Sequence, residues 1–229
     1  MSAQHIERYV QESLDRAWVA NQEVVPQVAS YIARAHLAGN RIYAFGSGHS
    51  HVLVEEMYYR AGGLTLVTPI WDSALMLHQD AQNASRLEQT PGYSRTIIEK
   101  LHWRPGDILW IISNSGRNPL IVELALAAHA ADLTVMALMS LHHANAVRAL
   151  SVSGEKLNDV ADFVLDNAGV VGDAGYYVNG VEHPLFPTST VVGSALVNWV
   201  WVAVADELSR LGCPPEVLTS FNVDTGSFR

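Results

Sequence analysis

The chain has very little cysteine and little positive charge. A single cysteine, Cys213, among 229 residues excludes an intrachain disulfide and a thiolate metal cluster. Charged residues make up only 16% of the chain, and 14 Lys and Arg face 23 Asp and Glu, which gives a net charge of -9. Proteins that follow nucleic acid or an anionic membrane surface need a basic face. We therefore expect neither as a partner.

The chain also lacks an evident targeting segment. Residues 1–22 are polar and amphipathic, so no signal peptide is visible and we expect a cytoplasmic protein. The longest apolar stretch, residues 190–205, is shorter than the roughly 20 residues that span a membrane. It contains Ser194 and Asn198, and acidic residues follow it. This stretch predicts a helix that is buried or packed in a dimer.

Apolar segments of strand length alternate with segments of helical pattern. Buried strands that alternate with helices predict a parallel sheet covered on both faces, hence an α/β fold of three αβα layers. We expect one domain, with N-terminal helices over 1–39, the core over 40–211 and a tail over 212–229. The five strands are expected at 41–45, 64–67, 107–112, 133–139 and 162–165, with helices at 51–61, near 93–101 and at 119–131, and residues 172–187 as a loop.

Two loops rich in Ser and Gly each follow a buried strand and precede a helix. The first, residues 46–50, reads Gly-Ser-Gly-His-Ser, and the second, residues 113–118, reads Ser-Asn-Ser-Gly-Arg-Asn. Unpaired N–H groups and the positive end of a helix dipole favour an anion at such a position. In a doubly wound sheet both loops would lie where the winding reverses. Together they predict one site for a small phosphorylated metabolite.

Nucleotide-binding motifs do not fit these loops. The Gly-Lys-Ser/Thr of a P-loop is missing. A dinucleotide fingerprint would need a glycine where His51 stands and an acidic residue where Val67-Thr68-Pro69 ends the second strand. The alternative to a binding site is that the loops only start helices, with Ser50 and Asn118 as N-caps and Pro119 as a first helical residue.

The strand-loop-helix order and the two motifs, Phe-Gly-Ser-Gly-His-Ser at 45–50 and Ile-Ser-Asn-Ser-Gly-Arg-Asn at 112–118, resemble the sugar isomerase (SIS) domain family. That family includes phosphoheptose isomerases and N-acetylmuramic acid-6-phosphate etherases, and its fold is flavodoxin-like. The resemblance covers roughly residues 25 to 211. It implies that Ser50, Ser113 and Ser115 hold the phosphate, with Ser47 and Asn118 beside it, where relatives often carry Ser or Thr in place of Asn118. The expected substrate-binding residues are Ser47, Gly48, His49, Ser50, Ser113, Asn114, Ser115, Gly116 and Asn118.

Aldose–ketose isomerisation needs a base that moves a proton between neighbouring carbons. The candidates are Glu55 and Glu56 on the helix after the first loop, and His183 in the loop before the last helix. A solvated carboxylate pair and an ordinary loop histidine are the simpler alternatives. His49 and His51 could be half of a metal site, but no third ligand has a recognisable spacing, so we expect neither metal nor cofactor.

These patterns favour a cofactor-independent isomerase of sugar phosphates or amino-sugar phosphates. Two alternatives remain open: a phosphosugar sensor without activity, and a lyase that cleaves a lactyl ether from a sugar phosphate. The apolar last helix and the amphipathic first helix, with Ile6, Val10, Leu14 and Trp18 on one face, predict a homodimer or homotetramer.

Overall fold

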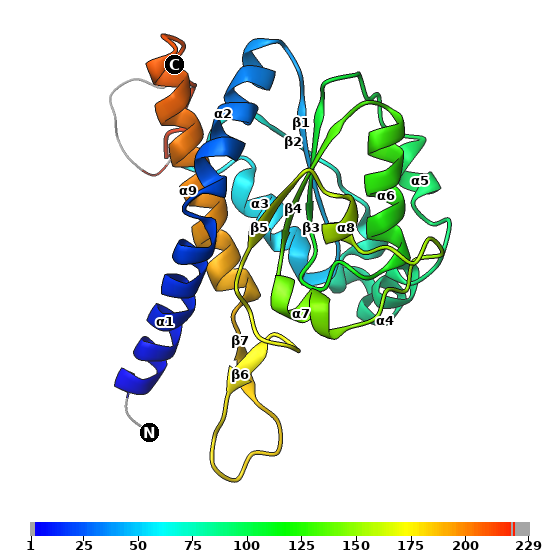
Figure 1. The fold of residues 1–229 in the computed structure, drawn as a ribbon, viewed down its shortest axis with the longest axis vertical. Coiled ribbons are helices and arrows are strands. Elements are labelled where there is room, and N and C mark those ends of the chain that lie inside the picture. Colours follow the sequence, from blue (N-terminus) through cyan, green and yellow to red (C-terminus); the bar gives the residue numbers. More distant parts are fainter. Residues whose placement is uncertain (1–2, 221, 223–229) are drawn as a thin grey trace.

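The computed structural model describes residues 3–220 and residue 222. Its centre is a parallel sheet of five strands in the order β2-β1-β3-β4-β5 (Figure 1). The predicted parallel αβα fold is therefore confirmed. The strands are β1 (Ile42–Gly46), β2 (Val67–Pro69), β3 (Ile108–Ile112), β4 (Thr134–Met139) and β5 (Phe163–Asp166).

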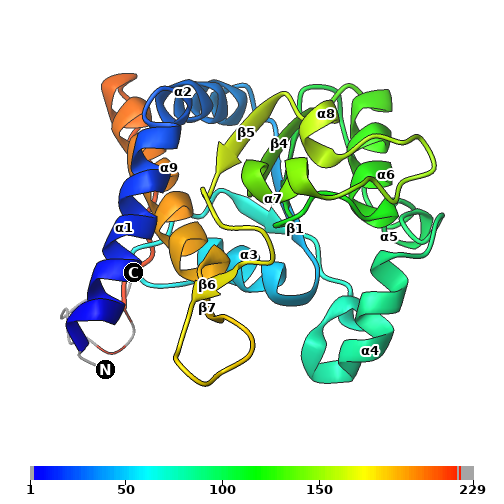
Figure 2. The ribbon, with the colours of Figure 1, turned by 60° about the horizontal axis from the view of Figure 1, so that its bottom comes forward.

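Helices pack on both faces of this sheet, because the apolar strands alternate their side chains between two cores (Figure 2). In β3, Ile108, Trp110 and Ile112 face one core, whereas Leu109 and Ile111 face the other. The first face is covered by α1 (Ala3–Asn21), α2 (Val24–Leu37), α3 (His51–Met57) and α9 (Ser189–Arg210), and the second by α4 (Leu77–Glu88), α5 (Arg95–Ile98), α6 (Pro119–Ala130) and α8 (Leu157–Val160).

The long apolar helix α9 is the central helix of the first face. It has 22 residues, because it continues past residue 205 to Arg210, and it is the one helix in the described residues long and apolar enough to cross a membrane. It packs against α1, α2 and α3, and its buried side chains include Val192, Leu196, Val200 and Val204. Of the two predicted arrangements, burial within the chain is observed for these residues, and packing in a dimer stays a prediction.

Several boundaries differ from the prediction. The strand expected at 64–67 begins at Val67, and Leu64 instead pairs with Val217 in an isolated antiparallel bridge. Helix α3 ends at Met57, because Tyr58 is extended and Tyr59 has a φ of 47°. The helix expected near 93–101 is limited to α5.

Several elements lie in segments for which no helix or strand was predicted. Helix α4 has a polar sequence and buries only Ala84; we predicted no helix there, although Leu77, Ala84 and Leu87 recur at helical spacing. The loop expected over 172–187 contains an antiparallel hairpin of β6 (Ala174–Tyr176) and β7 (Leu185–Pro187), which projects at the bottom of Figure 1. The tail predicted over 212–229 lies partly outside the described residues.

The free edge of β5 is occupied by a side chain from α1. The Asn21 amide nitrogen donates to the carbonyl of Asp166 at 2.7 Å, and the Asp166 N–H donates to the Asn21 amide oxygen at 2.9 Å. Asn21 is fully buried and also donates to the carbonyl of Ala17. The end of α1 is thereby fixed to the outer strand of the sheet.

The strand order places the reversal of winding between β1 and β3. Chain segments that leave these two strands therefore start side by side at the carboxyl edge of the sheet, as the sequence predicted. The residues paired at this edge are Gly46 and Ile112, the last residues of their strands.

Candidate functional site

The second loop, residues 113–118, is fixed to the rest of the fold through its backbone. Ser113 donates its N–H to the carbonyl of Leu138 at 3.1 Å, and Gly116 accepts from the N–H of Leu157 at 2.8 Å. Gly116 has a φ of +59°, and a Cβ there would lie 2.6 Å from Cε of Met139 and 3.0 Å from Cβ of Leu157. Only glycine fits this position without displacing its neighbours.

Helix α6 begins after this loop with Asn118 as N-cap and Pro119 as first residue, as predicted. The side chain of Asn118, however, makes no capping hydrogen bond and donates instead to Glu88 at 3.0 Å. The Ser113 hydroxyl accepts from the N–H of Gly116 at 3.3 Å. Within residues 3–220, the N–H groups of Ser115 and Arg117 have no protein acceptor, so they remain available to an anion.

The first loop, residues 46–50, is held by short-range contacts. Ser50 donates its N–H to the carbonyl of Ser47 at 3.0 Å, and Nδ1 of His51 lies 2.6 Å from the carbonyl of Gly48. Ser50 precedes α3 in a helical conformation and its hydroxyl makes no capping bond. Ser50 is thus the N-cap of α3 by position, as predicted, but it does not cap the helix with its side chain.

A small pocket, with about 20 Å³ of space for water, lies beyond the carboxyl ends of β1, β3, β4 and β5. Leu53, Ile112 and Leu138 form its apolar part. Its polar lining comes from four segments that are distant in the sequence: His49, Ser50, Asn114, Asn167, Ser189 and Thr190. The Asn167 amide donates to the oxygen of the Asn114 amide at 2.9 Å and so joins the end of β5 to the second loop.

Three of the predicted binding residues, His49, Ser50 and Asn114, line this pocket. The other predicted binding residues lie in the same two loops but outside its lining: Ser47, Gly48, Ser113, Ser115, Gly116 and Asn118.

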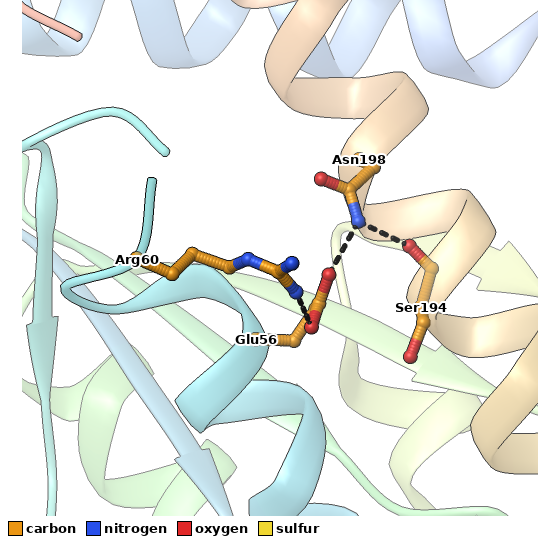
Figure 3. A network of polar contacts seen from close by, with 4 residues as sticks. All are labelled: Glu56, Arg60, Ser194 and Asn198. Atoms are coloured by element: carbon orange, nitrogen blue, oxygen red, sulfur yellow. Dashed lines mark hydrogen bonds and ion pairs between the residues drawn. The ribbon is translucent and has the colours of Figure 1, made fainter. Parts of the chain in front are cut away.

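The two predicted catalytic carboxylates on α3 have different surroundings. The Glu55 side chain is 58% exposed, and its Oε1 lies 3.4 Å from Nε2 of the buried His51. The Glu56 side chain is 19% exposed; it forms an ion pair with Arg60 and accepts from the amide of Asn198 at 2.7 Å (Figure 3). Asn198 also donates to the carbonyl of Ser194, so Glu56 is part of a network between α3 and α9.

His183 is not brought to this pocket within one copy of the chain. It is exposed in the segment that connects β6 and β7, on the hairpin that projects from the body of the molecule (Figure 1). The structure also places His142 and His143 in the short helix α7 (Leu141–Ala146), where the Ser140 hydroxyl accepts from the N–H of His143. Burial lowers the pKa of the His143 imidazole.

Sequence reasoning missed Glu88, the last residue of α4, which contacts both loops. Its Oε2 accepts from Asn118, and its Oε1 would lie 3.2 Å from a Cβ added to Gly48. Burial raises the pKa of Glu88, and contacts with the Ser47 hydroxyl and the Asn118 amide oppose this rise. No pattern in the polar sequence of α4 indicates this role.

Other missed residues had a signal that could have been used. Asn167 directly follows the fifth strand, and Ser189 and Thr190 begin the last helix, so a search for polar residues at every strand end and nearby helix start would have found them. Among the described residues, no group of three or more His, Cys, Asp or Glu side chains could hold a metal ion.

Comparison with known proteins agrees with this architecture. Residues 6–140 match the family model of the SIS domain. The chain is 34% identical to a UPF0309 protein of Shouchella clausii over 222 residues. This aligned region covers 96% of this chain and 89% of that protein. It is 36% identical to a UPF0309 protein of Geobacillus thermodenitrificans with the same coverage.

Two solved structures are similar in fold. One is a phosphoheptose isomerase from Francisella tularensis, with a TM-score of 0.52 and 17% identity over 89% of this chain and 98% of that one. The other is a phosphoheptose isomerase from Neisseria gonorrhoeae, with a TM-score of 0.51 and 18% identity over 90% and 98%. At such identities the similarity concerns the fold.

Proposed function

Because the chain belongs to the SIS domain family, and within it to the UPF0309 proteins, we propose that it binds a phosphorylated sugar beyond β1 and β3 and interconverts its aldose and ketose forms. The observation that carries this proposal is the convergence of the two Ser-rich loops at the reversal of winding, beside a pocket with a polar lining. The phosphoheptose isomerases with a similar fold are consistent with it.

The phosphate is proposed to lie against the second loop. The N–H groups of Ser115 and Arg117 and the hydroxyls of Ser113 and Ser115 lie at the start of a 12-residue helix, where the helix dipole favours an anion. The loop is already fixed by its contacts with Leu138 and Leu157, so little order has to be created when the ligand binds. Ser50 and Ser47 of the first loop would complete the phosphate site.

Glu55 is the carboxylate that best suits the proton transfer. It is exposed and contacts His51, whose other ring nitrogen is held by the carbonyl of Gly48. Glu56 is engaged by Arg60 and Asn198, so its oxygens are less available to a substrate. We therefore assign proton abstraction to Glu55 and structural support to Glu56, with His183 as a candidate acid from the hairpin.

We also propose that two or four copies associate through the first helical face. Trp18 on α1 and Ala195, Trp199 and Val202 on α9 line an open apolar groove, and Val202 is 69% exposed. Monomers rarely leave such a surface uncovered. Light scattering that gave the mass of one chain at micromolar concentration would contradict this assembly.

A thermal-shift screen tests the proposed function. Sugar phosphates and their unphosphorylated counterparts are added separately, and we expect only the phosphorylated compounds to raise the midpoint of unfolding. A ligand at about a hundred times its dissociation constant adds roughly 2.7 kcal/mol of stability. Equal stabilisation by the free sugars would contradict a phosphate site.

The compounds that bind are then tested for turnover. Interconversion of the aldose and ketose forms supports the isomerase. Release of lactate from a lactyl ether would identify a lyase instead, and binding without turnover would identify a sensor.

A further inference from the structure

The unusual feature of this site is a carboxylate that lies between its two loops. Glu88 reaches from the end of α4 to Asn118 in the second loop, with 3.0 Å between Oε2 and the amide nitrogen. Its other oxygen lies against Gly48 in the first loop, where the absence of a side chain leaves room for it. Helix α4 accordingly packs against both the first loop and α6.

This carboxylate has no cationic partner. The ion pairs found among residues 3–220 and 222 do not include Glu88, and its polar contacts are the neutral Ser47 and Asn118 side chains. A half-buried carboxylate without a cation ionises at a cost, which is the reason for its raised pKa.

The titratable and charged groups on the elements around Glu88 make their contacts with other residues. On the first loop and α3, His51 binds the carbonyl of Gly48 and contacts Glu55, and His49 is exposed. On α4, Arg86 donates to Asn83, and the ring of His78 lies 6.5 Å from that of His51.

On the side of α6, Glu123 accepts from Gly92 and Ser94. Arg117 of the second loop has no ion pair among the described side chains. Glu88 is therefore the titratable group that contacts both loops.

We propose that Glu88 is a positioning residue that joins the two loops and takes up a proton when an anion binds between them. This inference rests on the proposed function, since the anion is the phosphate of the ligand. A phosphate dianion at the loops makes the ionised carboxylate less favourable, and by linkage the ionised carboxylate weakens phosphate binding by the same factor. Protonated Glu88 keeps its place between Ser47 and Asn118 without repelling the ligand.

Two variants separate the two parts of this role. Glu88→Gln keeps the length and one oxygen acceptor for Asn118 but never ionises. Glu88→Asp still ionises but is one methylene shorter, so it cannot contact both loops. Glu99→Gln is the matched control, because it removes one carboxylate charge from an exposed position near the end of α5.

The experiment measures the affinity of each full-length protein from about pH 4 to about pH 8, by calorimetry or thermal shift. The probes are inorganic phosphate and the sugar phosphate that stabilises the wild type most. The ligand and all other ionisable groups are the same in the wild type and in Glu88→Gln. The ratio of the affinities of these two proteins at each pH therefore reports on Glu88 alone.

We expect the wild type and Glu88→Gln to bind alike at the acid end. At the alkaline end we expect Glu88→Gln to bind roughly tenfold more tightly, a typical size for such coupling. Glu99→Gln should follow the wild type throughout. Glu88→Asp should bind more weakly at every pH and keep the pH dependence of the wild type.

The outcomes distinguish this inference from the function on which it rests. If the ratio of the affinities of the wild type and Glu88→Gln stayed constant across the pH range, the proposed proton uptake would be overturned. Wild-type affinity in Glu88→Asp would overturn the joining of the loops, and this variant keeps the test valid if Glu88→Gln fails to fold. A wild type that responds to neither phosphate nor any sugar phosphate would contradict the proposed function itself.

Discussion

The two Ser-rich loops have similar compositions but are held in different ways. In the second loop, the carbonyls of Asn114, Gly116 and Arg117 accept from Ser140, Leu157 and Leu150, residues far along the chain. In the first loop, the bonds from Ser50 to Ser47 and from His51 to Gly48 stay within a few residues. The first loop also has a long-range polar contact with Glu88.

This difference assigns different tasks to the two loops. A loop fixed by distant parts of the fold can hold a group that every ligand shares, and here that group is the proposed phosphate. A loop held locally can adjust, and α3, which follows the first loop, carries the proposed base. Changes in the second loop should therefore affect affinity, and changes after the first loop should affect turnover.

The largest effect is expected for Glu55→Gln, which tests the catalytic half of this comparison. Loss of a general base typically lowers the rate by about 10²–10⁴-fold. We expect kcat to fall by this amount while the dissociation constant of the sugar phosphate changes little. Steady-state kinetics and a binding measurement on the same protein check the two numbers.

Glu56→Gln is the neighbouring control. It keeps an acceptor for Asn198 and loses the ion pair with Arg60, so its rate should stay much closer to that of the wild type. If both variants kept normal rates, catalysis would have to be reassigned to His183 or to a histidine of the first loop.

The next effect concerns the binding half. Each charge-assisted hydrogen bond contributes about 1.5–3 kcal/mol, so Ser113→Ala combined with Ser115→Ala should weaken phosphosugar binding by about a hundredfold or more. The helix should still form, because Asn118 and Pro119 begin it without help from either hydroxyl. A normal thermal response of the double variant to sugar phosphates would show that these serines do not hold the ligand.

A smaller effect on folding tests the rigidity of the second loop. Gly116→Ala places a Cβ 2.6 Å from Met139 at a φ of +59°, and it should lower stability by about 1–3 kcal/mol. Gly154→Ala is the control: its φ is +80°, but no atom lies within 4 Å of the added Cβ. Chemical denaturation should show a greater loss of unfolding free energy for Gly116→Ala than for Gly154→Ala. Equal losses would mean that the second loop moves to accommodate the added methyl group.

The smallest effect is a dependence of stability on pH that comes from Glu88 between the two loops. Because the pKa of Glu88 is raised in the folded protein, its ionisation costs stability above that pKa and nothing below the unfolded value of about 4.3. Glu88→Gln should therefore melt slightly higher than the wild type at neutral pH, and this gain should vanish at acid pH. A lower melting temperature at neutral pH would contradict an unfavourable carboxylate.

The sequence predicted the loops well because their signal is local. An apolar run followed by Gly and Ser, as in Ile108–Ile112 and the loop after it, specifies a buried strand and the turn at its end. The parallel order then followed from the intervening helices.

What the sequence could not predict depends on tertiary contacts. Helix α4 is mostly polar, with Leu77, Ala84 and Leu87 at helical spacing, and nothing in that pattern indicates that Glu88 contacts both loops. The position of β2 depends on pairing with Ile42 and Tyr43. The pocket joins Asn114 to Asn167 across 53 residues, a contact that no local motif contains.

The closing of the sheet by Asn21 has a consequence for how copies of this protein can meet. The Asn21 amide bonds to both backbone groups of Asp166, as the next strand of a growing sheet would. At the opposite edge β2 has only three residues and ends at Pro69, which has no N–H to offer. Both borders of the sheet thus resist the addition of a foreign strand. The central sheet is thereby protected against edge-to-edge association, which leaves the helical surfaces beside it for ordered contacts.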